Sequence, residues 1–399
     1  EKRIKKGLDL RLPGEPEQTV HPGPDVQHIA LCGRDYHGLK PRLLVAEGDA
    51  VGRGQPLFID KRDPAVNYCS PARGIISAVN RGPRRRLDSV VVQLQPSSAE
   101  DVQFEPLSDE EQAALGRDDL SDRLQRSGLW SAFRTRPFSR VPLSGSRPHA
   151  IFVTATDTRP LAADPAVIVG ADPEAFRSGL HLLPLLTSGT VYVCTGPGWN
   201  IELPQVERLT EVRFSGPHPA GLPGTHMHLL DPVGTGRVAW QIDCQDVMAI
   251  GNLVSRGEIP GSRLIALGGE CLARPRLVKT VMGASINELL VDEFRQCEGC
   301  RVLSGSVLDG RRASDGLAYL GRYHAQVSVI PEGGDRRLFG WLFGKGRFGW
   351  STSQHGRYSG MIPMPVFEKV MPLDILPAAL FRALLVKDTD QAQALGCLE

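Results

Sequence analysis

Apolar residues form short clusters in one part of the chain and longer β-branched runs in another. Between residues 26 and 95 the clusters are short, as in Val26–Leu31 and Leu43–Val45, and turn residues separate them. This pattern predicts a domain of short strands. Ala150–Ala155 and Thr190–Cys194 are continuous apolar runs, which are typical of strands buried on both faces of a parallel sheet. The chain therefore begins with a predicted β domain and continues with an α/β layer.

Helices are predicted around these runs. Pro173–Leu186 connects the two runs, and a strand, a helix and a second strand in this order indicate a Rossmann-like α/β layer. Two helices are expected before the layer, at Asp109–Leu115 and Leu120–Ser127, with Gly128 ending the second. Another is expected near the end of the chain, at about Ala378–Val386.

The N-terminal region contains a motif with a specific spacing. Glu47–Ile59 has the form EGD-x-V-x-x-GQ-x-L, in which Gly48 and Gly54 supply tight turns. Together with Ser70–Val79, it resembles the biotinyl/lipoyl-type barrel-sandwich hybrid. That family carries its cofactor on a lysine between two such motifs, and Lys61 lies in this interval. Its neighbours differ from the family's modification site, so we expect a solvated lysine, with a modified carrier as an alternative.

A third unit is predicted after the α/β layer. Ser262–Gly269 and Pro275–Val281 have strand patterns, and Ser285 lies where the N-cap of a following helix is expected. This arrangement resembles the soluble-ligand-binding β-grasp family. Cys297 and Cys300 form a C-x-x-C that lacks the four ligands of a zinc or iron–sulfur site and does not open a helix. We expect no redox or metal role for this pair.

Composition indicates a folded chain of several domains. The 399 residues are 41% hydrophobic and 23% charged, and 46 basic against 45 acidic side chains leave a net charge of +1. This balance argues against a nucleic-acid-binding protein. Prolines and glycines interrupt the longest uncharged span, Ser178–Ile201, so no transmembrane helix is expected. No signal peptide is expected, and the scattered cysteines favour a reducing compartment.

Aromatic residues and arginines alternate in Leu129–Arg140. Phe133 and Phe138 stand next to Arg134 and Arg136, and such a segment can stack on a planar ring while guanidinium groups hold its oxygen atoms. The competing interpretation is that the aromatic residues are core and the arginines are solvated. Residue chemistry alone favours this second interpretation.

Three histidines lie in Gly216–His228. His226 and His228 alternate along a run that is predicted to be strand-like, so both could face a metal ion. Because no carboxylate or cysteine stands at ligand spacing, we expect a turn-rich connector without a metal site.

Five longer strings are specific enough to indicate a known family. They are IKKGLDL (4–10), SGLW-x-AFRTRPFS (127–139), GPHPAGL-x-GTHMH (216–228), YLGRYH (319–324) and EKVMPLD (368–374). With these strings, over nearly the whole chain, the sequence resembles the NqrA family, one of the subunits of the bacterial sodium-translocating NADH:quinone oxidoreductase. It is also similar to the NADH-binding subunit of respiratory complex I and to the RnfC subunit of the Rnf complex.

This resemblance implies a peripheral subunit on the cytoplasmic face of the bacterial inner membrane. The complex passes electrons from NADH to ubiquinone and exports sodium ions, and NqrA docks mainly on the membrane subunit NqrB. In the complex I relative a glycine-rich flavin loop follows the Ser-Gly-Leu found here at 127–129. Bulky residues replace those glycines, so we expect no cofactor on this chain, and flavin and iron–sulfur centres on other subunits. The isolated chain is then not catalytic.

The combined prediction is a multidomain α/β and β protein. We expect a barrel-sandwich hybrid at 1–98, a Rossmann-like α/β domain at 99–257 and a β-grasp domain at 258–310. A C-terminal α/β-helical extension at 311–399 is expected to contain a flexible loop rich in glycine and aromatic residues, followed by terminal helices.

The predicted function is quinone binding and docking within the complex, without a catalytic residue or metal site on this chain. One alternative is a purely structural cap, in which the same arginine and aromatic side chains anchor an interface. The predicted quinone-binding residues are Phe133, Arg134, Arg136 and Phe138, with Tyr36 and His37 of the loop Gly33–Gly38 as a second wall.

Overall fold

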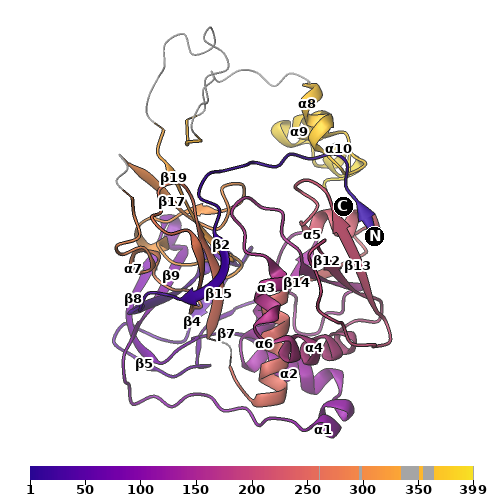
Figure 1. Ribbon diagram of the computed structural model, residues 1–399. Helices are drawn as coiled ribbons and strands as arrows, with labels where there is room; N and C mark the ends of the chain where they lie inside the picture. The colour runs from indigo at the N-terminus through magenta and orange to yellow at the C-terminus, as the bar shows by residue number, and fades with distance from the viewer. Residues whose placement is uncertain (260, 296–298, 334–349, 354–363, 399) are drawn as a thin grey trace.

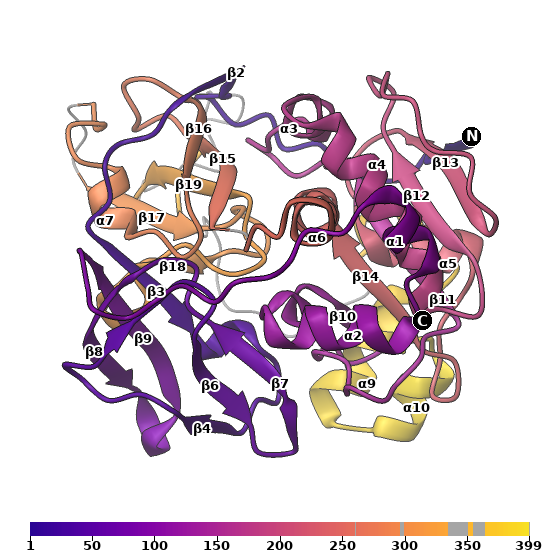
Figure 2. The ribbon, with the colours of Figure 1, turned by 90° about the horizontal axis from the view of Figure 1, so that it is seen from below.

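The computed structural model describes residues 1–259, 261–295, 299–333, 350–353 and 364–398. Within them, three units that contain β-sheets are followed by a helical C-terminal segment (Figure 1). Figure 2 shows the barrel strands, the β-grasp strands and the α/β unit arranged around α6 (Cys244–Arg256). The predicted fold class is confirmed. Trp341 and most of the predicted aromatic loop lie outside the described residues.

The α/β unit is built on a six-stranded sheet. The strands predicted from the two apolar runs are adjacent and parallel, as β11 (Ala150–Ala155) and β12 (Val191–Thr195). Within this sheet, only the edge strand β10 (Arg134–Arg136) runs antiparallel to its neighbour. The order across the sheet is β1 (Lys2–Arg3), β13 (Leu209–Ser215), β12, β11, β14 (Ala239–Asp243) and β10 (Arg134–Arg136).

Helices cover both faces of this sheet. Ile151 and Val153 belong to the core that includes α4 (Pro173–Leu182) and α6, whereas Phe152 packs in the core with Met227. The predicted helix over 173–186 ends earlier, at Leu182, and a 3-10 turn completes the segment. Three further helices accompany them. The first two confirm predictions, and the third was not predicted: α1 (Asp109–Ala114), α2 (Arg117–Arg126) and α3 (Pro165–Gly170).

The histidine-rich stretch is a helix, so the prediction of a strand-like run was wrong. Pro223 occupies the first turn of α5 (Pro223–Leu230), where its fixed φ and missing N–H favour helix initiation. Residues two apart on a helix do not share a face. His226 and His228 therefore do not point in one direction.

The N-terminal unit is a barrel-sandwich of two small sheets. Lys61 is exposed in the turn between β6 (Pro56–Asp60) and β7 (Asp63–Cys69), and its backbone N–H donates to the Lys40 carbonyl. One sheet has the order β3 (His28–Cys32), β9 (Leu87–Leu94), β8 (Gly74–Arg81) and β5 (Ala50–Val51). The other has the order β4 (Pro41–Leu43), β6 (Pro56–Asp60) and β7 (Asp63–Cys69).

The β-grasp unit has a six-stranded mixed sheet and the short helix α7 (Ile286–Leu289). The Ser285 side chain caps this helix by accepting from the Glu288 N–H, which confirms the predicted N-cap. The sheet includes strands from both sides of the 258–310 range. Its order is β18 (Arg311–Arg312), β17 (Cys300–Ser304), β19 (Gln326–Pro331), β15 (Ser262–Gly268), β16 (Arg276–Val281) and β2 (Glu17–Pro22).

The two ends of the chain both pack on the α/β unit. The N-terminal segment adds β1 to the α/β sheet and β2 to the β-grasp sheet before the barrel begins. At the other end, the backbone N–H of Asp374 donates to His228 Nε2 of α5 at 3.0 Å. The C-terminal helices are α8 (Pro365–Val370), α9 (Pro377–Val386) and α10 (Thr389–Ala394), and α9 confirms the predicted helix.

A buried ion cluster joins the α/β and β-grasp units. Asp246 of α6 accepts from Arg263 of β15 and from both terminal nitrogens of Arg322, at 2.9 and 3.1 Å. All three side chains are less than 10% exposed. Burial by itself raises the pKa of Asp246, but the charges of the two arginines outweigh it and the net pKa is lowered. The cluster therefore holds an ionised carboxylate between two units.

Replacing this carboxylate should destabilise the protein strongly. Asp246→Ala leaves two buried guanidinium groups uncompensated, and we expect a loss of about 3–5 kcal/mol in the free energy of unfolding. Urea denaturation followed by tryptophan fluorescence measures the effect. As a control, Asp122→Ala removes an exposed pair with Arg126 and should cost less than about 0.5 kcal/mol. Equal effects of the two substitutions would contradict this account.

Candidate functional site

The edge strand β10 divides the arginine- and phenylalanine-rich segment into two environments. Phe133, just before the strand, is fully buried, with its ring centroid 5.3 Å from that of Trp240 and 6.0 Å from that of Trp130. Arg134 and Arg136 are two residues apart in the strand, so their side chains leave its other face. The predicted site residues therefore separate into one core aromatic residue and two arginines beside cavities.

The two arginines have contacts that orient them without neutralising their charge. The Arg134 guanidinium lies 4.3 Å from the Tyr323 ring centroid, and its Nη1 donates to Ser139 Oγ at 3.4 Å. Arg136 Nε donates to Gln241 Oε1 at 2.8 Å. Among the described residues neither arginine has a carboxylate partner. Burial lowers the pKa of both groups, for Arg136 to about 10, and the charge of Arg159 adds to each shift.

The residues after β10 form a strained turn that presents an aromatic ring. Phe138 and Ser139 have φ angles of 77° and 50°, a left-handed conformation that non-glycine residues rarely adopt. Thr135 Oγ1 stabilises the turn by donating to the Pro137 carbonyl and accepting from the Arg140 N–H. The Phe138 side chain is 61% exposed as a result.

The second predicted wall meets this segment. His37 Nδ1 lies 3.2 Å from the carbonyl oxygen of Ser139, so the loop Gly33–Gly38 contacts the turn. Tyr36 is buried, with its ring 4.5 Å from Tyr68 and 6.2 Å from Tyr323, edge to face. The structure thus brings His37 to the surface turn and packs Tyr36 against Tyr323, the ring over which the Arg134 guanidinium lies.

The two arginines line two different cavities. An outer cavity of about 270 Å³ is lined by Arg136, Pro137 and Phe138, by α5 and by the C-terminal residues Cys397 and Leu398. An inner cavity of about 70 Å³ is lined by Arg134, Arg159 and Tyr323 and by the ends of β11 and β14. From β11 the chain continues to β12 and β13 on one side of β11, and it later returns to form β14 on the other side. The inner cavity, between β11 and β14, therefore lies where the strand order reverses. Ligands of open α/β sheets bind at this point.

Sequence reasoning did not assign Arg159, Arg322 and Tyr323 to the site. Arg322 and Tyr323 belong to the YLGRYH string that carried the family resemblance, and this string was the available signal. The Tyr323 hydroxyl donates to the Ser131 carbonyl at 2.8 Å, and Arg322 bonds Asp246. Their contribution depends on chain segments distant in sequence, which no local pattern reveals.

The histidines and cysteines belong to other environments. Among the described residues no group of three or more His, Cys, Asp or Glu side chains has the arrangement to hold a metal ion. His226 Nε2 lies 2.8 Å from the Ala220 carbonyl, and its ring packs on Phe214. Cys300 is disulfide-bonded, and Cys297 lies outside the described residues.

Comparison with known families assigns each unit. Family models match residues 2–95 as the NqrA N-terminal barrel-sandwich hybrid domain, 115–259 as the NqrA second alpha/beta domain and 264–315 as the NQRA C-terminal domain. A solved chain of the NAD+-reducing NiFe-hydrogenase in its air-oxidized state has a TM-score of 0.40 at 14% identity, over 57% of this chain and 51% of that chain. That likeness adds nothing to the assignment.

Similarity to curated proteins extends over the full length. The chain is 47% identical to the NqrA subunits of the Na(+)-translocating NADH-quinone reductases of Yersinia pestis bv. Antiqua (strain Angola) and Klebsiella pneumoniae (strain 342). It is 45% identical to the same subunit of Saccharophagus degradans. Each alignment covers 100% of this chain and 92% of the relative.

These three domains in this order define a multidomain subunit of an NADH-quinone reductase. The chain belongs to the NqrA family of the Na+-translocating NADH-quinone reductase, as the sequence strings indicated, and is one of the subunits of that complex. None of the helices in the described part of the chain has the length and apolar character that crossing a bilayer requires.

Two buried histidines should make stability depend on pH. Burial lowers the pKa of His226 and of His324 to about 4, below the ordinary value near 6.5. Between these values the unfolded chain binds more protons, so the free energy of unfolding should fall as the pH drops from 6.5 to 4. Denaturation at several pH values measures this slope. His226→Gln with His324→Asn should flatten it, whereas His181→Gln at an exposed position should not; an unchanged slope in the double variant would assign it to other groups.

Proposed function

We propose that this chain contributes to quinone binding in the complex and docks on the membrane subunit NqrB from the cytoplasmic face. The observation that supports quinone binding is the outer cavity, where a guanidinium group lies in a wall that is otherwise largely apolar. Pro137, Phe138, Met227 and Val233 supply apolar surface beside Arg136. Such a cavity suits a ligand with a polar ring and a hydrocarbon tail.

Arg136 and Phe138 are the proposed contacts to the quinone ring. Gln241 holds the Arg136 Nε, which leaves the terminal nitrogens available to donate to a carbonyl oxygen. The exposed face of Phe138 offers a stacking surface for the ring. Although burial lowers its pKa to about 10, Arg136 remains charged near neutral pH and is a stronger donor than a neutral group.

The other predicted residues have supporting positions in this proposal. Phe133 anchors β10 in the core, and His37 contacts the turn that presents Phe138. Arg134 lies over the Tyr323 ring and lines the inner cavity, and the Tyr36 ring packs edge to face against the same tyrosine. Electrons for quinone reduction would come from NADH through other subunits, since the proposed role of this chain is binding alone.

Photolabelling of the assembled complex with a reactive ubiquinone analogue tests this role. We expect label on the peptide that contains Phe138, lost in the presence of excess quinone. Arg136→Gln with Phe138→Ala should reduce this label at least about tenfold, because a charge-assisted hydrogen bond and a stacking surface are removed. Arg147→Gln, at an exposed position outside the cavity, is the control. Label confined to the membrane subunit would instead favour a purely structural cap.

The surface of α9 supports docking on a membrane partner. Leu384, Leu385 and Val386 are 52%, 69% and 74% exposed, whereas Leu380 and Ala383 of the same helix pack inward. Three adjacent exposed aliphatic side chains are unusual on a free surface and are typical of an interaction site. In Figure 1 the C-terminal helices lie at the periphery of the molecule. We propose that this patch contacts the membrane subunit.

A charged residue in the α9 patch should weaken assembly. Leu385→Asp places a charge at the proposed interface, and we expect this variant to be lost from the purified complex while the isolated chain keeps its thermal stability. Co-purification through a tag on the membrane subunit measures assembly. Val291→Asp is the matched control, because Val291 is 60% exposed in the β-grasp unit. Normal assembly of Leu385→Asp would remove α9 from the interface.

A further inference from the structure

We propose that the inner cavity between β11 and β14 binds a phosphate group, held by Arg134 and Arg159. This goes beyond the proposed quinone site, which lies in the outer cavity and uses Arg136. Three features support it: an arginine without a carboxylate partner, arginine donors that no carboxylate occupies, and the position of the cavity in the sheet.

The first observation is that one arginine of the cavity lacks a carboxylate partner. Arg159, Arg263 and Arg322 are each paired with a carboxylate, whereas Arg134 has none among the described residues. Nearby Arg136 also has no carboxylate partner among the described residues. Burial lowers the pKa of Arg134, and the charges of Arg159 and Arg322 act in the same direction. A buried cation without a counter-ion is costly, so an anion at this place would relieve the repulsion.

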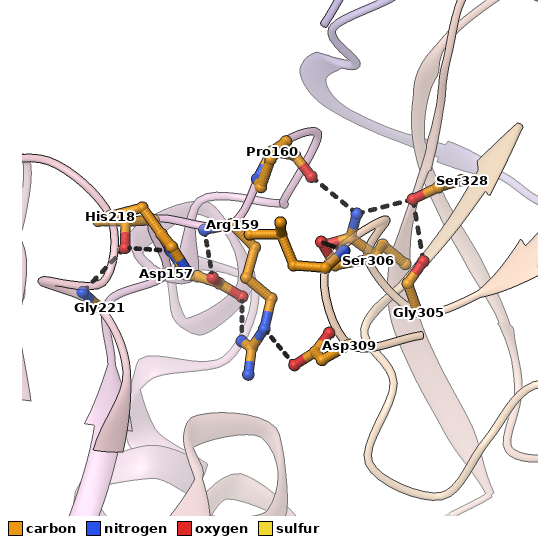
Figure 3. A network of polar contacts seen from close by, with 12 residues as sticks. Asp157, Arg159, Pro160, His218, Gly221, Gly305, Ser306, Asp309 and Ser328 are labelled. Atoms are coloured by element: carbon orange, nitrogen blue, oxygen red, sulfur yellow. Dashed lines mark hydrogen bonds and ion pairs between the residues drawn. The ribbon is translucent and has the colours of Figure 1, made fainter. Parts of the chain in front are cut away.

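The second observation concerns the hydrogen-bond donors of Arg159. Its Nε donates to Asp309 at 2.8 Å and its Nη1 to Asp157 at 3.0 Å, which fixes the guanidinium between the α/β and β-grasp units. Figure 3 shows that the remaining terminal nitrogen points away from both carboxylates. Arg134 has donors free of carboxylates as well. Guanidinium groups of this kind are the usual partners of phosphate oxygens.

Acidic side chains also line the cavity, and their state decides whether an anion is accepted. Asp246 is already bonded to Arg263 and Arg322. Asp243 caps α6 by accepting from the Gln245 N–H at 2.8 Å. Desolvation and the charge of Asp246 raise the pKa of Asp243, so this carboxylate opposes an anion less than an ordinary one. Asp243 is nevertheless the single group expected to weaken phosphate binding.

The volume of the cavities bears on the source of the phosphate. The inner cavity, about 70 Å³, has room for a small group only. A third cavity, of about 580 Å³, is also lined by Arg159 and extends along the carboxyl ends of β11 and β12, past Gly196 and Trp199. The organic part of a phosphate ester could occupy this larger space, whereas free phosphate would use the inner cavity alone.

Calorimetric titration of the full chain with inorganic phosphate and with a nucleoside monophosphate tests the proposal at constant ionic strength. Binding of either ligand supports it, and tighter binding of the nucleotide would identify an ester as the ligand. Arg134→Gln should weaken binding at least about tenfold, because a charge-assisted hydrogen bond is lost. Arg140→Gln, in the same segment but exposed and outside the cavity, should leave it unchanged.

Asp243→Asn gives a second test. Its expected effect is tighter binding, whereas a misfolded variant would bind phosphate less tightly. Asparagine is as good an N-cap as aspartate, so α6 should be preserved while a negative charge leaves the cavity. Phosphate should then bind more tightly than to the wild type. Failure of both ligands to bind, an unchanged affinity in Arg134→Gln or weaker binding in Asp243→Asn would overturn the proposal. A chain that does not bind phosphate could still be labelled by the quinone analogue at Phe138, so the two proposals can fail separately.

Discussion

The geometry of the candidate site depends on one buried carboxylate, Asp246, which is shared by two arginines. Moving α6, β15 or the segment before β19 apart would break these ion pairs. The broken pairs would leave buried charges without a partner, which is costly. Arg322 is thereby fixed, and so is its neighbour Tyr323, whose ring contacts both the Arg134 guanidinium and the Tyr36 ring. This ion cluster, which also lines the inner cavity, therefore helps to determine where the barrel, the α/β unit and the β-grasp unit meet.

Strand β10 then converts one sequence segment into two separate environments. Its pairing with β14 directs Phe133 into the aromatic core, while Arg134 and Arg136 leave the other face. The two arginines diverge further, since one lines the inner cavity and the other the outer cavity. An edge strand suits this role because its free side is not occupied by another strand. Phe133 is therefore a core residue, as the second interpretation of this segment predicted, whereas the arginines are half-buried and not fully solvated.

Local patterns predicted what depends on local physics. The apolar runs of β11 and β12, the Gly128 stop after α2 and the Ser285 cap of α7 follow from residues close in sequence. The helix at His226 was missed because alternation was given more weight than the proline that starts α5. The site itself was predicted only in part. The backbone N–H of Arg322 donates to Asp35, 287 residues away, and no local pattern reveals that such segments meet.

The contrast among the arginines connects the two cavities. Arg159, Arg263 and Arg322 are bonded to carboxylates, whereas Arg134 and Arg136 have none among the described residues. The charges of Arg134 and Arg159 both lower the pKa of Arg136, so these groups repel one another. An anion held by Arg134 and Arg159 would offset that repulsion and stabilise the charge on Arg136, the proposed donor to a quinone carbonyl. Binding at the two cavities would then be mutually favourable, because an electrostatic coupling of this kind acts equally in both directions.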